Sequence, residues 1–464
     1  MMLVPATAGV ASSSTASEQA STNDARDIPV EPYNGLPTAI EDLQDEVGDD
    51  VSFAEAIELG ELVGEHQAAT LGTATELDLD LATLTPEHES PSAAARTLVE
   101  RHDAQATNAQ LDQLDQLDKL DDPVRTELTD TIDAFLTFHA AAQGLSQPTP
   151  GALDGVFAAR NGLLDEVADL DAALAASQET PPTIHNPPFL SVDLDGEDNN
   201  YTEDTVLIID AGGNDTYENN AGGTENWPGT TVNPRLGFSP AAALVDLGEG
   251  QDSYGADAAS LGVAGGVYGQ AAGFLVDAGG DDIYNAHSVG VNGGTWGRGP
   301  YGCFFILGIG CEDYDLGASG FLLDASGDDT HPSGGGLGVN GGGIGGSGTL
   351  LDVAGDDTYE SGDGGTNGGG AGPGAGLLAD LAGDDSYTAE DGSVNGGAGD
   401  TSANDYPASS IGDLPVSQGL LFDAAGTDTY QDNEGGTGTD KTVVPKGDSA
   451  GAQLDHTPPG GSNE

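Results

Sequence analysis

Seven aspartates occupy one position of a repeated motif in the second half of the chain, which makes them candidate ligands for cations. They lie in short segments such as "GNDTY" at 213–217 and "GDDTY" at 355–359. Equivalent residues of neighbouring parallel strands lie about 4.8 Å apart. At that distance two carboxylates repel by about 1 kcal/mol in water and by about 3–4 kcal/mol at an effective dielectric constant near 20. The row therefore predicts bound cations between the copies.

Oxygen ligands from carboxylates and glycine carbonyls suit calcium, so several calcium ions are the expected cofactor. The predicted ligands are Asp215, Asp252, Asp282, Asp329, Asp357, Asp385 and Asp428. Two alternatives stay open: monovalent salt ions along the row, or a solvated acidic edge that binds no specific ion.

A strand and a turn must repeat along the chain to position these aspartates. The copies read, for example, "LLDVAGDDTY" at 350–359 and "LADLAGDDSY" at 378–387, and the shortest step between copies is 28 residues. A fixed period of this size is typical of stacked repeats, so longer steps are interpreted as units with insertions. The first aspartates of the seven copies are Asp210, Asp246, Asp277, Asp324, Asp352, Asp380 and Asp423.

Each of the other motif positions has a predicted structural role. Ile or Leu two residues before the first aspartate is expected to face the core. The first aspartate is expected to accept a backbone N–H two residues on and so form a turn. The final tyrosine, replaced by His331 in the fourth copy, is expected to pack. Asn-Gly pairs between copies suit either a tight turn or a stacked asparagine ladder.

The G-x-D-x-Y segments resemble the core of the haemolysin-type (RTX) calcium-binding nonapeptide, G-G-x-G-x-D-x-U-x. That resemblance implies a parallel β-roll with calcium bound at the seven second aspartates. The match covers about five residues of each unit. The period near 28 and the absence of tandem copies depart from the RTX pattern. The prediction is therefore an RTX-like motif on a wider parallel β-helix.

The first half of the chain is predicted to contain four or five amphipathic helices. In "DDPVRTELTDTIDAFLTFHAAAQG", Asp122 is a suitable N-cap, Pro123 suits the first turn, and apolar residues recur at helical spacing. His66, His102 and His139 lie on or near these helices without a metal-binding spacing. They are therefore predicted to be ordinary surface or core residues.

The predicted fold class is α + β multidomain, with an N-terminal helical bundle followed by a parallel β-helix, or β-solenoid, of about seven repeat units. A Pro-rich break at 179–189 marks the boundary. The predicted parts are a leader or disordered linker (1–35), the helical bundle (36–178), a Pro/Asp-rich linker (179–205), the solenoid repeats (206–435) and a disordered acidic tail (436–464).

The charge of the chain limits its partners. It carries 79 acidic and 10 basic residues, for a formal net charge of −69. Nucleic acid is excluded as an ordinary partner because phosphate binding needs Lys and Arg. At molar salt the Debye length is about 3 Å, so such a surface stops repelling itself. The composition is typical of a halophilic protein and predicts loosening in dilute buffer.

The N-terminal residues and the cysteines bear on localisation. "MMLVPATAGVASSSTASEQAS" resembles the rear half of a secretory signal, with a disordered tail as the alternative. No apolar run reaches the roughly 18 residues of a transmembrane segment. An extracellular or cell-surface location is expected, with a cytoplasmic one as the alternative. Cys303 and Cys311 are a candidate disulfide in an exported chain and small apolar residues in a reducing compartment.

Scarce residue types gather in the insertions between copies and predict a binding surface. Trp227 and Arg235 lie in one insertion, and Trp296, Arg298 and Tyr301 lie in another. Aromatic faces stack on sugar rings and Arg binds carboxylates, so a surface glycan or another protein is the expected partner. The alternative is that these tryptophans cap apolar ends and these arginines neutralise nearby aspartates.

Three functional hypotheses follow. The favoured one is a secreted or surface-associated, calcium-stabilised repeat protein with a structural, adhesive or ligand-binding role. The second is a β-helix enzyme acting on acidic polysaccharide, with Arg298 or His287 near the chemistry. The third is a metal-free intracellular acidic scaffold. The sequence contains no GxSxG, HExxH or P-loop motif, so an enzyme is less favoured and no catalytic residue is assigned.

Overall fold

The computed structural model describes most of the helical half and the cores of the repeats. The described residues are 36, 39–40, 51–71, 86–102, 106–144, 150–177, 183–224, 239–255, 266–267, 271–285, 292–293, 295–296, 318–333, 340–344, 346–361, 366–371, 374–389, 394–395, 418–432, 442–446 and 449–455.

The helical half contains five described α-helices and one 3-10 turn, and side-chain caps start two of the helices. They are α2 (Phe53–Leu71), α4 (Pro91–Arg101), α5 (Asn108–Leu114), the 3-10 turn η2 (Leu117–Lys119), α6 (Asp122–Gly144) and α7 (Pro150–Ala176). The Ser90 side chain caps α4, and Thr107 and Gln110 form a capping box at α5. Helix α6 ends at Gly144, as predicted, but it begins one residue earlier than predicted. Asp122, the predicted N-cap, is its first residue, and Arg125 N donates to the carbonyl oxygen of Asp121.

The repeats build two large sheets. In the first sheet, nine strands run parallel and the two outermost, β1 and β24, are antiparallel and close its ends. Its strands, in spatial order, are β1 (Ile184–Asn186), β2 (Leu190–Asp193), β4 (Leu207–Asp210), β6 (Ala241–Asp246), β9 (Ala271–Asp277), β12 (Ala318–Asp324), β15 (Gly346–Asp352), β19 (Ala375–Asp380), β22 (Gln418–Asp423), β25 (Ser449–Asp455) and β24 (Thr442–Lys446).

The second sheet has eight parallel strands, each following its partner of the first sheet by a short turn. They are β3 (Asn200–Tyr201), β5 (Thr216–Tyr217), β7 (Ser253–Tyr254), β10 (Ile283–Tyr284), β13 (Thr330–Ser333), β16 (Thr358–Ser361), β20 (Ser386–Ala389) and β23 (Thr429–Asp432). Two smaller sheets contain β8 (Gly266–Val267), β11 (Thr295–Trp296), β14 (Gly343–Ile344) and β18 (Gly370–Ala371), and β17 (Thr366–Asn367) with β21 (Val394–Asn395).

Strand pairing places each repeat position directly beside its equivalent in the next copy. Asp324 pairs with Asp277 on one side and with Asp352 on the other. Tyr359 pairs with His331 and with Tyr387. The in-register stacking of the motifs, which their constant internal spacing predicted, is therefore present in both sheets.

The first sheet is buried on both faces. The residues two before the first aspartates, such as Leu322 and Leu350, pack against the tyrosines of the second sheet. The alternate residues, such as Phe321 and Leu351, share a single core with the helices. Parallel strands buried on both sides read as continuous apolar runs, which is why segments such as "FLLD" show no polar alternation.

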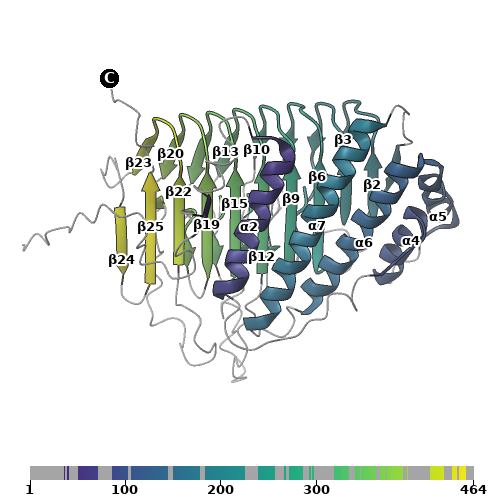
Figure 1. Cartoon of the computed structure of the whole chain (residues 1–464), viewed down its shortest axis with the longest axis horizontal. Coiled ribbons are helices and arrows are strands. Elements are labelled where there is room, and N and C mark those ends of the chain that lie inside the picture. The colour runs from purple at the N-terminus through teal and green to yellow at the C-terminus, as the bar shows by residue number, and fades with distance from the viewer. Residues whose placement is uncertain are drawn as a thin grey trace, which may run out of the picture.

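Helices α2, α6 and α7 lie across the outer face of the first sheet (Figure 1). The ring of Phe138 on α6 lies 6.0 Å from the ring of Phe274 on β9. The amide Nε2 of Gln67 on α2 donates a 2.7 Å hydrogen bond to Thr349 Oγ1 on β15. The molecule is thus layered: helices, first sheet, second sheet.

The predicted fold class, a helical bundle followed by a β-solenoid, is wrong. Nine and eight parallel strands form two large sheets, and the helices lie on the first of them in a layered α/β arrangement with one shared core. The physical reason is the burial of both strand faces, since the outer apolar face needs a cover that the repeats do not supply.

Two predicted unstructured segments contain sheet strands. The predicted linker includes β1, β2 and β3, and it contributes a further copy of the motif in which Asp193 pairs with Asp210. The predicted tail includes β24 and β25, where Asp455 pairs with Asp423. Both copies were missed because their glycine and acidic spacing differs from that of the seven clear ones.

Candidate metal site between the two sheets

The first aspartate of each copy faces the space between the sheets. Successive side chains of a strand point to opposite faces, so Asp352 lies on the same face as Leu350, which packs against the tyrosines. In five copies Oδ1 of this aspartate accepts the backbone N–H two residues on, as at Gly212 (3.0 Å) and Gly279 (2.9 Å). The predicted turn-forming role is therefore confirmed for Asp210, Asp246, Asp277 and Asp324, where the turn uses only one of the two carboxylate oxygens. It is not seen at Asp352 and Asp380, whose Oδ1 atoms have no hydrogen-bond partner among the described residues.

The second oxygen of the first aspartate is held by tyrosine hydroxyls. Tyr217 donates to Asp246 Oδ2 at 2.6 Å, Tyr284 to Asp324 Oδ2 at 2.5 Å, and Tyr359 to Asp352 Oδ2 at 2.7 Å. Together with His331, these tyrosines form a continuous stack whose neighbouring ring centroids lie 4.6–4.9 Å apart. The tyrosine position, predicted only to pack, also supplies hydrogen-bond donors.

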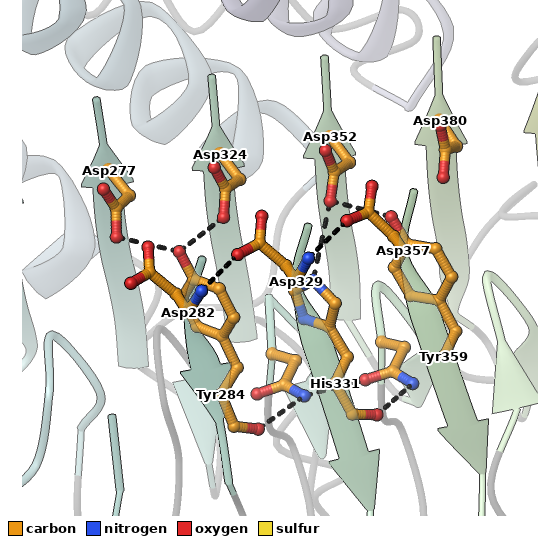
Figure 2. Close-up of polar contacts among 12 residues, drawn as sticks. Asp277, Asp282, Tyr284, Asp324, Asp329, His331, Asp352, Asp357, Tyr359 and Asp380 are labelled. Carbon is orange, nitrogen blue, oxygen red and sulfur yellow. Dashed lines mark hydrogen bonds and ion pairs between the residues drawn. The ribbon is translucent and has the colours of Figure 1, made fainter. Parts of the chain in front are cut away.

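The second aspartates form a ladder of their own. Oδ1 of each accepts the backbone N–H of the second aspartate in the preceding copy. Asp282 N donates to Asp329 Oδ1 at 2.6 Å, and Asp329 N donates to Asp357 Oδ1 at 2.7 Å. Figure 2 shows the carboxylates of Asp282, Asp329 and Asp357 facing the row of first aspartates.

A glycine three residues after the first aspartate permits this close stacking. A Cβ added to Gly355 would lie 1.5 Å from the carbonyl oxygen of Gly327, and one added to Gly383 would lie 1.5 Å from that of Gly355. Both glycines also have φ of +156°, where side chains are strained. No other residue fits, which explains why glycine precedes the second aspartate by two residues in every copy.

In six of the second aspartates the remaining oxygen is buried, and the described part of the chain offers it no hydrogen bond. Oδ2 of six of them is solvent-inaccessible and has no hydrogen-bond partner in the described part of the chain: Asp215, Asp252, Asp282, Asp329, Asp357 and Asp385. Their residues are at most 3% exposed. A buried carboxylate oxygen without a partner is costly, so these atoms are the strongest structural sign of a missing ligand.

The two rows meet in clusters of three carboxylates. One contains Asp210, Asp215 and Asp246, and another contains Asp282, Asp324 and Asp329. Within each cluster one ligand oxygen per residue lies within 4.8 Å of the others, and all of these residues are buried. Oxygen-only clusters of this kind fit a hard cation such as calcium, with the two aspartate rows as its ligands.

The environment makes ionisation of these carboxyl groups unfavourable in the absence of a cation. Burial raises the pKa of Asp215 to about 7. Burial and the neighbouring Asp352 carboxylate raise the pKa of Asp385 to about 8. The pKa of Asp282 and that of Asp357 are also raised, first by burial and then by nearby carboxylates. The site therefore holds either protons or cations at neutral pH.

An outer row of exposed acids runs beside the buried ladder. Asp356 and Asp384 immediately precede the second aspartates, and both are exposed. Their carboxylates bond to the backbone in the same manner, since Asp384 N donates to Asp356 Oδ1 at 2.8 Å. These residues share the charge and the ladder geometry of the buried row but have access to water.

Asparagines form a third ladder in the same stack. Asn292 Nδ2 donates to Asn340 Oδ1 at 2.8 Å, and Asn340 Nδ2 donates to Asn367 Oδ1 at 2.8 Å. Asn292 and Asn340 also have positive φ of 48° and 43°. The two readings that the Asn-Gly pairs allowed, a tight turn and a stacked ladder, are both correct.

The structure brings the predicted metal-ligating aspartates together but describes little of the predicted binding loops. Trp296 lies in β11, where it pairs with Val267 and Ile344. The other proposed ligand-binding and disulfide residues lie outside the described residues: Trp227, Arg235, Arg298, Tyr301, Cys303 and Cys311. Sequence reasoning missed the first aspartates and the tyrosines as functional residues. The available signal was their spacing from the second aspartate, which is the same in all copies for the tyrosine position and in six of seven for the first aspartate.

A separate polar cluster borders a cavity of about 310 Å³ in the helical layer. His88 Nδ1 lies 2.5 Å from Asp133 Oδ1, and its Nε2 lies 2.8 Å from Thr97 Oγ1. Asp130 and Glu166 also line the cavity, and burial followed by Asp130 raises the pKa of Glu166 to about 7. The hydrogen-bonded chain Thr97–His88–Asp133 has the order of a catalytic triad, but Thr97 does not line the cavity. Its hydroxyl is therefore not assigned as a nucleophile.

Comparison with known proteins adds no relative. No family model matches the chain, and no curated protein or solved structure is significantly similar to it. Among the described helices, none combines the length and the apolar character that a bilayer crossing requires. The residues between the two sheets are therefore the basis on which a function can be argued.

Proposed function

We propose that the protein is a secreted or surface-associated repeat protein whose stacked sheets are stabilised by calcium and which has a structural or adhesive role. The observation that carries the proposal is a set of six buried second-aspartate Oδ2 atoms that have no hydrogen-bond partner among the described residues and lie beside the first aspartates. The G-x-D-x-Y segments are proposed to act as RTX-like calcium motifs.

The groups around the clusters favour charged carboxylates. Tyrosine O–H and backbone N–H groups are donors, as at Asp246, which accepts from Tyr217, Tyr254 and Gly248. Donors lower the pKa of a carboxyl group, whereas burial raises it. A row built to hold protons would gain from acceptors instead. These donors are neutral groups and do not neutralise the carboxylates. A bound cation would supply the balancing positive charge.

A structural role fits the way the clusters are distributed. Each cluster joins residues from adjacent copies, so a bound cation would hold one repeat against the next. Ligation that exists only in the folded stack adds its binding free energy to the stability of the fold. The proposed partner, a surface glycan or another protein, would then bind a scaffold whose rigidity depends on calcium.

The test is a calcium titration of the full chain, because the helices share a core with the first sheet and removal of them would expose it. Chelator-treated protein is titrated calorimetrically in molar sodium chloride, and its melting temperature is followed at constant ionic strength. Saturable binding of several calcium ions with a rise in melting temperature is expected. A flat response to calcium at constant ionic strength would overturn the proposal.

A matched pair of variants separates site binding from surface charge. Asp357→Asn with Asp385→Asn removes two buried carboxylates, and Asp356→Asn with Asp384→Asn removes two exposed ones from adjacent positions. Asparagine keeps an acceptor for the backbone N–H in all four cases. The first pair is expected to lower the number of bound calcium ions, while the second pair leaves it unchanged. Equal effects would mean that calcium binds only to the general surface charge.

A further inference from the structure

The fourth copy departs from the others at one buried position. Six of the seven clear copies end in tyrosine, whereas this copy has His331. Its imidazole occupies the same stack, with ring centroids 4.6 Å from Tyr284 and 4.8 Å from Tyr359 and with nearly parallel planes. The residue is 0% exposed. A nitrogen ligand therefore stands where the other copies place a hydroxyl donor.

The imidazole does not replace the tyrosine hydrogen bond. His331 Nε2 lies 3.5 Å from Asp352 Oδ2, beyond the usual N···O hydrogen-bond distance of about 2.7–3.2 Å. Neither ring nitrogen has a hydrogen-bond partner among the described residues, and the same is true of Asp352 Oδ1. The neighbouring tyrosines already donate to one oxygen of each aspartate, since Tyr284 donates to Asp324 Oδ2 and Tyr359 donates to Asp352 Oδ2.

The spacing of these groups suits a small divalent ion. One atom each from Asp324, His331 and Asp352 lies within 4.8 Å of the other two, and all three residues are buried. Bonds of about 2.0–2.2 Å in a tetrahedral site place neighbouring ligand atoms roughly 3.4 Å apart, close to the 3.5 Å between His331 Nε2 and Asp352 Oδ2. Figure 2 shows the imidazole directed at this carboxylate.

We propose that Asp324, His331 and Asp352 form a single site for a zinc-class transition-metal ion within the row of aspartates. The imidazole distinguishes it from the oxygen-only clusters, because nitrogen ligands favour zinc and cobalt over calcium. The inference does not rest on calcium binding elsewhere, since this site can hold its ion while the other clusters hold protons. The imidazole of His331 distinguishes the fourth copy from the other six clear copies, which have tyrosine at this position.

The test uses cobalt(II) as a spectroscopic probe on the full chain, refolded from metal-free protein with calcium present throughout. The wild-type protein is expected to bind one cobalt ion that shows a paramagnetically shifted imidazole N–H resonance and that zinc displaces. His331→Tyr restores the residue of the other copies, and His331→Phe keeps the stacked ring without any ligand atom. Both variants are expected to lose the resonance and to bind this ion at least about tenfold more weakly.

Folding is checked by far-UV circular dichroism and by the calcium response, which both His331 variants should retain. Equal cobalt affinity in the wild-type protein and the variants, without a shifted imidazole signal, would overturn the proposal. Absence of cobalt binding in all of them would also overturn it. A calcium response that fails while the His331-dependent cobalt signal persists would reject the calcium proposal alone.

Discussion

Each residue of the motif contributes a different element of the buried site. In the third copy, Asp277 forms the turn, Gly280 lets the backbones approach, Asp282 bonds to the preceding copy, and Tyr284 donates to Asp277. Each role has a different physical requirement, so substitutions at these positions should destabilise the fold for different reasons. At the glycine there is no room for a side chain, and at the two aspartates the requirement is a buried carboxylate.

The glycine can be tested by adding a single methyl group. Gly383→Ala is expected to lower the free energy of unfolding by about 2–5 kcal/mol, because the backbone has positive φ and the new Cβ would overlap the carbonyl oxygen of Gly355. Urea unfolding at constant salt measures the change.

Gly162→Ala on α7 is the matched control. A Cβ at Gly162 meets nothing within 4 Å, and alanine favours a helix over glycine by about 0.5–1 kcal/mol. This variant should be unchanged or slightly more stable. If Gly383→Ala unfolded at the same urea concentration as the control, the tight stacking of the glycines would be wrong.

At the level of elements, the helices and the sheets depend on each other. Polar as well as apolar contacts join them: the Arg160 guanidinium on α7 lies 4.2 Å from the Phe321 ring centroid on β12, and Gln67 on α2 bonds to Thr349 on β15. The outer face of the first sheet is mainly apolar, with buried residues such as Phe321 and Leu351 that share the core of the helices, so loss of the helices would expose it to water. Helices and sheets are therefore expected to unfold as one cooperative unit.

Phe138→Ala tests this dependence. Phe138 on α6 is 1% exposed and contacts Phe274 on β9, so its truncation should cost about 3–5 kcal/mol. The far-UV helical signal and the near-UV tyrosine signal should shift to the same lower temperature. Ile283→Ala, at a side chain that is 47% exposed, is the control and should change stability by less than about 0.5 kcal/mol. Separate transitions for the helical and tyrosine signals would contradict a shared core.

At the level of the whole molecule, the buried carboxyl groups couple stability to pH. Burial raises their pKa values, to about 7 for Asp215 and to about 8 for Asp385. Above the ordinary aspartate pKa of about 4, the folded state then binds more protons than the unfolded state, and stability falls as pH rises. Stability from these groups is thus fully present near pH 4 and is lost as pH rises through about 7–8.

Chelator-treated protein should therefore melt at progressively lower temperature between about pH 5 and about pH 9. Calcium binds the ionised groups, so the increase in melting temperature that it produces should grow over the same range. Asp357→Asn with Asp385→Asn should flatten both trends, and Asp356→Asn with Asp384→Asn should preserve them. A melting temperature that rises with pH in the presence of chelator would contradict the buried acidic row.

The sequence by itself determined the local and periodic features of this protein. Helix limits such as Asp122 and Gly144 depend on residues close in the chain, and so does the turn at Asp210. The repeated motif also determined which aspartates stack, because parallel strands align equivalent positions, and the one extra residue in the second copy does not break this alignment. The copy beginning at Leu190 and the strand ending at Asp455 escaped prediction because their turns depart from the repeated spacing.

Only the tertiary structure decided how the helices and repeats combine and which carboxylates lose contact with water. Packing of α2, α6 and α7 onto the first sheet brings together residues that are far apart in the chain. No local sequence pattern encodes such contacts. Burial separates Asp357 from Asp356, although the two are adjacent and chemically identical. The second sheet also brings His331 and the tyrosines to the first aspartates. That layered burial makes one row of acids a candidate metal site and leaves the next row as solvated surface.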